Sequence, residues 1–87
     1  MQLRDWRTAA GKSQGECARL LDMEGGARTF QRVETGANKP DADMVERIGA
    51  MTEGCVTAAD MHATRLAWLK ANRPERFATP AQPEAAE

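Results

Sequence analysis

One short segment of the chain places long polar side chains on one side of a potential helix. Arg28 and Arg32 are four positions apart, so on a helix their guanidinium groups point the same way. Each guanidinium can donate paired hydrogen bonds to a guanine edge or to a phosphate, and the Gln31 carboxamide matches the hydrogen-bonding edge of adenine. Arginine and glutamine also form ordinary solvated helix faces. Whether this is a binding face or only a solvated one therefore has to be judged from the structural elements predicted around it.

Those residues belong to a pattern of two short helices joined by a glycine-containing turn. Apolar spacing predicts one helix over about residues 14–21 and a second over about residues 27–35. Gly25 and Gly26 allow the positive φ angles at which helices stop, and Gly36 is suited to end the second helix. Two helices joined in this way, with a polar face on the second, are what a DNA-reading helix-turn-helix needs.

Further helices are expected on both sides of this pair. The first covers about residues 2–10 and contributes Leu3 and Trp6 to the core. Downstream, a helix is expected to start at Pro40, with acidic residues in its first turn where the helix dipole favours them. A fifth helix is expected to follow Thr57.

Two helix starts carry the sequence pattern of a capping box. In this pattern a hydroxyl side chain accepts the third helical N–H, and an acidic side chain at that third position accepts the N–H of the cap residue. Ser13 with Glu16 fits the pattern before the helix at about residue 14, and Thr57 with Asp60 fits it before the fifth helix. Ser13 and Thr57 are therefore the expected N-caps of these two helices.

The chain resembles the lambda-repressor-like (Cro/XRE-type) helix-turn-helix family of phage and bacterial regulators. The resemblance covers about residues 2–62. The order and spacing of the matching segments indicate the fold more specifically than any single segment does. It implies an all-α fold, a compact bundle of about five short helices, here with an extra C-terminal helix. The matching segments are Leu3-Arg4-Asp5-Trp6-Arg7, Ser13-Gln14, Ala18, Leu21, Thr29 to Gly36, Lys39-Pro40, Met44 to Ile48 and Val56 to Met61.

The resemblance also assigns DNA-contacting roles. The positions of Ala27, Arg28 and Arg32 match those that reach base edges in the family. Gln14 and Thr29 match positions that hold the DNA backbone.

Two further assignments concern the surroundings of the second motif helix. The loop that follows it carries Asn38 and Lys39, which are expected to donate to phosphates. In the family, an arginine of the first helix pairs with a glutamate near the end of the recognition helix, and here that pair would be Arg7 with Glu34. Such a pair ties helices together, although a partly buried ion pair is weak support for stability.

The chain departs from the family in its turn. Between Leu21 and Thr29 it is about two residues longer than the commonest spacing, a length that could shift the start of the recognition helix. Met23 is expected to fill the place of an apolar core residue, whereas Glu24 would repel a nearby phosphate. A phosphate-binding glycine loop does not fit, because no Lys-Ser/Thr pair follows Gly26.

The C-terminal part extends beyond the usual module. Within residues 63–73 the chain is expected to be helical up to Asn72, because Pro74 limits the helix, which either completes the core or forms a dimer interface. The expected division is a DNA-binding domain with its extension helix over residues 1–73 and a flexible tail over residues 74–87. The apolar side chains that would form a dimer interface are Leu66, Trp68 and Leu69.

Composition narrows the function classes. The 87 residues suit one small domain. Neither an apolar run long enough to span a membrane nor a secretory signal is expected. The cytoplasm is therefore the simplest expected location. Two distant cysteines and a single histidine form no metal set, and no disulfide, cofactor motif or nucleophile–base pair is expected. These absences argue against an enzyme.

Charge is divided unevenly along the chain. The net charge is −1, but residues 1–40 carry seven Lys/Arg against five Asp/Glu, whereas residues 41–87 carry five against eight. The helix-turn-helix half is therefore mildly basic, which permits DNA binding but predicts modest non-specific affinity.

Two functions remain open at this point. The first is a sequence-specific regulator, a small Cro-type repressor of a phage, mobile element or bacterial operon that binds double-stranded DNA as a homodimer. The second is a protein-interaction module on the same fold, such as an antitoxin or an adaptor with a protein partner. The first is the favoured interpretation, because the polar face of Arg28, Gln31 and Arg32 lies on the second helix of the motif. The long turn, the near-neutral charge and the appended helix give slight support to the second.

Overall fold

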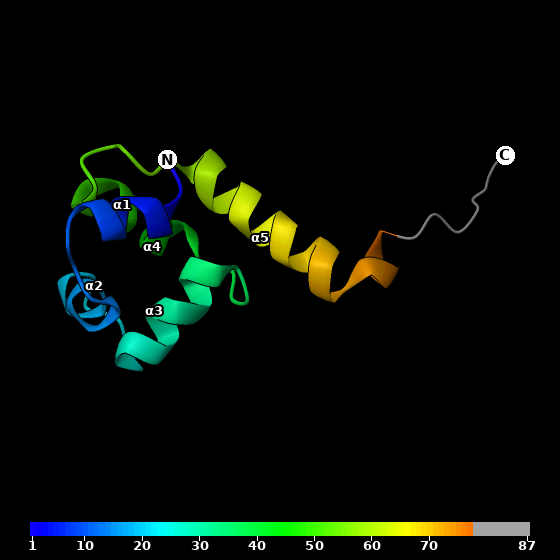
Figure 1. Ribbon diagram of the computed structural model, residues 1–87, viewed down its shortest axis with the longest axis horizontal. Coiled ribbons are helices and arrows are strands. Elements are labelled where there is room, and N and C mark those ends of the chain that lie inside the picture. The colour runs from blue at the N-terminus through cyan, green and yellow to red at the C-terminus, as the bar shows by residue number, and fades with distance from the viewer. Residues whose placement is uncertain (78–87) are drawn as a thin grey trace, which may run out of the picture.

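A computed structural model describes residues 1–77, and these residues contain α-helices, one turn of 3-10 helix and no strand (Figure 1). The predicted all-α class and the helix-turn-helix are confirmed. The elements in chain order are α1 (Leu3–Ala9), α2 (Gln14–Leu20), α3 (Gly26–Thr35), α4 (Ala42–Met51), α5 (Ala58–Asn72) and the 3-10 turn η1 (Pro74–Arg76).

The core lies where α1 to α4 meet the first turns of α5. Its largest fully buried side chain is Phe30 of α3, which occupies the middle of the bundle. Trp6, Met23, Met44 and Met51 are partly buried and pack against this centre, as expected for Trp6 and Met23. The remaining buried apolar residues are Leu3, Cys17, Ala18, Leu21, Val33, Ile48, Val56 and Met61.

Both predicted capping boxes are present. Glu16 N–H donates to Ser13 Oγ at 3.0 Å, and Ser13 N–H donates to Glu16 Oε1 at 2.8 Å. At α5, Asp60 N–H donates to Thr57 Oγ1 at 3.1 Å, and Thr57 N–H donates to Asp60 Oδ2 at 2.9 Å. These local bonds fix where α2 and α5 begin.

The start of α4 differs from the prediction. The sequence suggested a helix from Pro40, but α4 begins at Ala42, and Asp41 is its N-cap with extended backbone angles. Asp41 Oδ1 accepts the Met44 N–H at 2.8 Å. A carboxylate at the N-cap satisfies an otherwise unpaired N–H, so Asp41 stops the helix from starting earlier and Pro40 remains in the loop.

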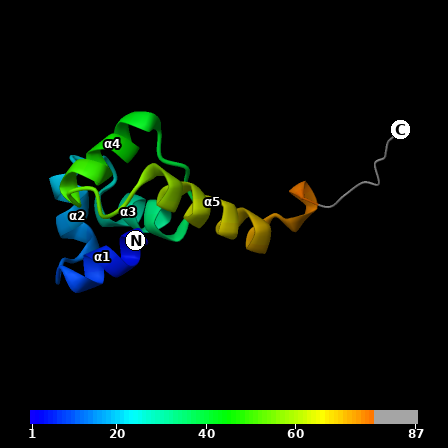
Figure 2. The ribbon, with the colours of Figure 1, turned by 90° about the horizontal axis from the view of Figure 1, so that it is seen from above.

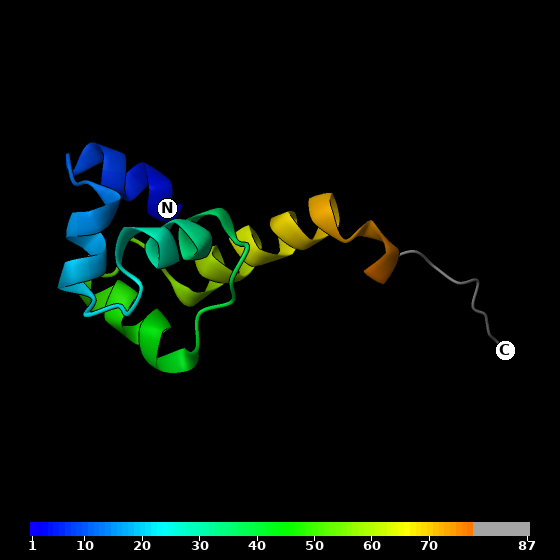
Figure 3. The same cartoon turned by 90° about the horizontal axis from the view of Figure 1, so that it is seen from below.

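The C-terminal extension is helical and ends before Pro74, as expected, but it is not a separate helix. It continues α5 through fifteen residues without a break. In three views the distal half of α5 leaves the bundle formed by α1 to α4 and projects away from it (Figures 1, 2 and 3). The predicted tail, residues 74–87, begins with η1, and its part from residue 78 on lies outside the described residues.

Candidate nucleic-acid interface

The turn between α2 and α3 runs from Leu21 to Gly25 and uses left-handed backbone angles. Asp22 has φ 52°, and Gly25, the N-cap of α3, has φ 87°. A Cβ on Gly25 would lie 2.0 Å from Thr29 Oγ1, so any other residue there would force the Thr29 side chain to move, besides adopting a left-handed φ. Met23 N–H donates to Ala18 O at 2.9 Å and its side chain packs against the core. The longer turn is thus folded back onto α2 and α3.

The two sides of α3 are sharply different. Phe30, Val33 and Glu34 are buried, whereas the residues proposed from the sequence to read bases are exposed. The exposed set is Ala27, Arg28, Gln31 and Arg32. The structure therefore brings these four side chains to one accessible surface, with α2 packed closely behind α3.

The residues predicted to hold phosphates fall into two environments. Asn38 and Lys39 are exposed in the loop after α3, where Asn38 N–H donates to Arg32 O at 3.1 Å. Thr29 is half-buried against the turn glycine Gly25. Gln14 is half-buried at the start of α2, and its side chain is engaged by another residue of the motif.

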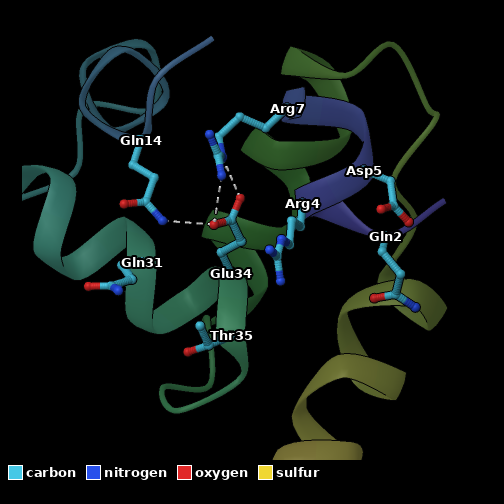
Figure 4. A pocket seen from close by; sticks show the side chains of 8 residues that line it. All are labelled: Gln2, Arg4, Asp5, Arg7, Gln14, Gln31, Glu34 and Thr35. Atoms are coloured by element: carbon cyan, nitrogen blue, oxygen red, sulfur yellow. Dashed lines mark hydrogen bonds and ion pairs between the residues drawn. The ribbon is translucent and has the colours of Figure 1, made fainter. Parts of the chain in front are cut away.

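That residue is Glu34, which joins three helices (Figure 4). Arg7 Nε lies 2.5 Å from Glu34 Oε2, and Gln14 Nε2 donates to Glu34 Oε1 at 2.9 Å. The Glu34 side chain is 4% exposed and that of Arg7 is 19% exposed. Arg7 Nη1 also donates to Lys12 O at 3.1 Å. The structure thus contains the Arg7–Glu34 pair that the resemblance implied, with Gln14 as its third member.

The electrostatics of this cluster favour the charged state of arginine. The hydrogen bond to Glu34 raises the pKa of Arg7 above its ordinary value, and the partial burial of the guanidinium opposes that rise. The arginine therefore stays charged at any pH at which the protein folds. Its pairing with Glu34 fixes α1 against α3, and the hydrogen bond from Gln14 to the same carboxylate ties the start of α2 to α3.

The C-terminus of α3 is held by α5 through contacts that the sequence did not suggest. Arg65 Nη1 donates to Gly36 O at 2.8 Å and to Ala37 O at 2.7 Å, and its guanidinium lies 5.4 Å from the centroid of the Trp68 ring. A Cβ on Gly36 would lie 2.5 Å from Thr64 O and 2.9 Å from Trp68 Cβ. The last carbonyl groups of any helix lack donors within that helix and need one from elsewhere. No local sequence pattern predicts that Arg65 donates to the carbonyls at the end of α3.

The candidate dimer residues differ in their roles within the single chain. Leu66, Trp68 and Leu69 are all half-buried. Trp68 contacts the end of α3, as the Gly36 distances show, so it contributes to the fold of the monomer. Leu66 and Leu69 are three positions apart, which places them on one side of α5.

Residues 1–77 contain neither a metal-ligand cluster nor a helix suited to span a membrane. No group of three or more His, Cys, Asp or Glu side chains that could hold a metal ion occurs within residues 1–77. None of the helices in the described part of the chain is both long and apolar enough to cross a membrane.

Comparison with known proteins identifies a family for the first part of the chain. A family model described as a helix-turn-helix domain matches residues 1–53, which include α1 to α4 and exclude α5. No curated protein and no solved structure matches the chain.

Proposed function

The chain belongs to the helix-turn-helix domain family, whose model matches residues 1–53, and from this premise we propose that it is a sequence-specific DNA-binding transcriptional regulator. One observation carries the proposal. The second helix of the motif, α3, buries one side in the core and presents Arg28, Gln31 and Arg32 together on the other. An exposed face of this chemistry on the second motif helix is suited to the major groove of DNA.

In the proposed complex, α3 lies in the major groove and its side chains contact different bases. Arg28 and Arg32 donate to guanine O6 and N7, and Gln31 pairs with adenine through N6 and N7. Ala27, at the exposed start of α3, is the fourth residue at the base edges. The αL turn before α3 and the Glu34 cluster behind it hold this face rigidly, which reduces the entropy lost on binding.

Phosphate contacts would position α3 without reading sequence. Asn38 and Lys39 are exposed after α3 and are available as donors, and Thr29 lies at its first turn. Gln14 gives one N–H to Glu34, and because a carboxamide nitrogen carries two hydrogens, the second can donate to a phosphate.

The regulator is further proposed to be a Cro-type repressor that binds an inverted repeat as a homodimer. Two recognition helices about 34 Å apart would occupy successive major grooves and exclude polymerase or another factor. The projection of α5 from the bundle, with Leu66 and Leu69 on one side, supports a role for this helix in pairing two protomers (Figure 1).

The test is selection of genomic or random DNA fragments by the purified protein at two salt concentrations. The wild type is compared with the Arg28→Ala/Arg32→Ala double variant, whose substitutions lie on the exposed face and leave the core intact. A matched control removes the same number of arginines elsewhere, at Arg19 and Arg76, both of which are exposed.

We expect the wild type and the control to enrich the same inverted repeat and the Arg28→Ala/Arg32→Ala variant to lose it. If the wild type and both variants bind weakly and without preference, the regulator proposal is wrong. Co-purification of a second protein in that case would direct attention to the interaction module.

A further inference from the structure

A polar groove separates α1 from α3 next to the proposed reading face (Figure 4). Its volume is about 560 Å³, and every residue that lines it is polar or charged. Gln31 and Thr35, four positions apart on the exposed side of α3, line one wall, and Arg4 of α1 lines the other. The groove therefore opens onto the same surface that carries the proposed base-reading residues.

The charges inside this groove are not equally available. Arg7 and Glu34 neutralise each other at 2.5 Å, and neither has free charge to offer a ligand. Arg4 is exposed and forms no ion pair within residues 1–77. Figure 4 shows its guanidinium extending from α1 towards α3, whereas the Asp5 side chain lies on the side of α1 away from α3. Arg4 is thus the available cation of the groove.

We propose that Arg4 contacts a DNA phosphate at the edge of the major groove that α3 enters, so that α1 forms part of the DNA-binding surface. The inference rests on the proposed function. It adds a third helix to a surface that the sequence assigned to α2, α3 and the loop after α3.

A phosphate fits this position better than a base does. A helix seated in the major groove has a sugar-phosphate strand on each flank, and residues from a neighbouring helix meet that strand before they meet the base edges. Arg4 stands on α1, across the groove from Gln31 and Thr35, and not on α3 itself. Its guanidinium can give two parallel N–H bonds to phosphate oxygens.

The chain offers a close control for this residue. Arg19 is also exposed, also within a short helix, and forms no ion pair within residues 1–77, but it does not line the groove. Arg4→Gln and Arg19→Gln remove the same charge, so only the position differs. Arg4→Lys keeps the charge at the groove. Circular dichroism and thermal melting test whether all three variants fold like the wild type, as expected for exposed positions.

The experiment measures binding constants between 50 and 200 mM salt, on the selected fragment and on a random-sequence duplex. One lost phosphate contact lowers the slope of log K against log salt by about 0.9. The affinity ratio of wild type to Arg4→Gln should therefore shrink about 3.5-fold over that range, on both duplexes. Arg4→Lys should recover the wild-type slope, and Arg19→Gln should match the wild type closely.

Three results would overturn the inference. Arg4→Gln could show the same slope as Arg19→Gln, or Arg4→Lys could fail to restore the slope. The third is a change of preferred base at one position with Arg4→Gln, which would make Arg4 a base reader. In each case the proposed function survives if the Arg28→Ala/Arg32→Ala variant still loses the site. A wild type that binds neither duplex would overturn both.

Discussion

Two exposed cations near the end of α3 illustrate how position decides what a charge contributes. Arg32 stands on the helix that would enter the major groove, and Lys39 stands in the loop that follows it. A guanidinium that faces base edges discriminates between sequences, whereas an ammonium that faces phosphates attracts every sequence alike. Net charge alone cannot separate these roles.

The expected outcome for Arg32→Ala is a loss of about 1–3 kcal/mol at the preferred site and a relaxed preference at one base pair. Lys39→Ala should weaken binding to all sequences equally and reduce the salt slope by about one. Binding titrations against the site and its single-base variants distinguish the two. Equal, sequence-independent losses in both variants would contradict the role of Arg32 as a base reader.

Residue identities predicted much of the proposed site because its signals are local. The i, i+4 spacing of Arg28 and Arg32 placed both on one face, and the Ser13–Glu16 and Thr57–Asp60 patterns located two helix starts. The bond from Gln14 to Glu34 could not be predicted, because it depends on how α2 crosses α3. The same holds for Arg65, whose partners at Gly36 and Ala37 are distant in sequence.

At the level of elements, the junction of α3 and α5 depends on one glycine. Gly36 has φ 95°, and the backbone of α5 at Thr64 leaves no room for a Cβ. Gly54 has a similar φ of 83°, but nothing lies within 4 Å of the position that a Cβ would take there. A substitution at Gly54 therefore costs only backbone strain, whereas one at Gly36 adds a steric clash to that strain.

Gly54→Ala should destabilise the fold by about 1–2 kcal/mol, the cost of a left-handed alanine. Gly36→Ala should cost clearly more, since Thr64 and Trp68 must also move. Urea denaturation of both variants measures the difference. If the two variants lose equal stability, α5 is not packed against the end of α3 as described.

Helix capping at α5 carries a pH dependence. Asp60 accepts from the terminal ammonium of Met1 at 2.8 Å and from the N–H of Thr57 at 2.9 Å, and these bonds lower its pKa from 3.8 to about 2. A lowered folded-state pKa favours the folded state fully above the unfolded pKa of 3.8. The stabilisation is then lost as the pH falls through about 2.

Asp60→Asn should therefore lower the melting temperature at pH 7, and its deficit relative to the wild type should shrink between about pH 4 and pH 2. Asp43→Asn is the control, since Asp43 is an exposed carboxylate whose ion pair is with Arg47 on its own helix. Thermal melts monitored by circular dichroism across this range provide the test. A deficit for Asp60→Asn that is constant with pH would rule out the ionised cap as its source.

For the whole molecule, α5 is the element that distinguishes this chain from a minimal module. The family match ends at residue 53, and α5 runs from Ala58 to Asn72 as one helix. The sequence indicated helix for residues 63–73 but not its direction, because direction is set by the packing of Thr64 and Trp68 on Gly36. Only the folded chain shows that the distal half leaves the bundle (Figure 2).

Leu69→Lys should shift the proposed dimer towards monomer and weaken binding to an inverted repeat more than binding to a half-site. Ala67→Lys, an exposed position two residues away, introduces the same charge and should do neither. Sedimentation equilibrium and titration of the two DNA lengths measure these effects. An unchanged oligomeric state with Leu69→Lys would remove α5 from the interface.

The chain also contains two thiols of opposite accessibility. Cys17 is fully buried, and burial raises the pKa of its thiol, whereas Cys55 is exposed in the turn between α4 and α5. Maleimide reagents attack thiolates at accessible sites, so the native protein should accept a single spin label or fluorophore at Cys55. In a symmetric assembly, the two identical labels would give one interprotomer distance by pulsed spectroscopy, without any engineered cysteine and before any operator is known.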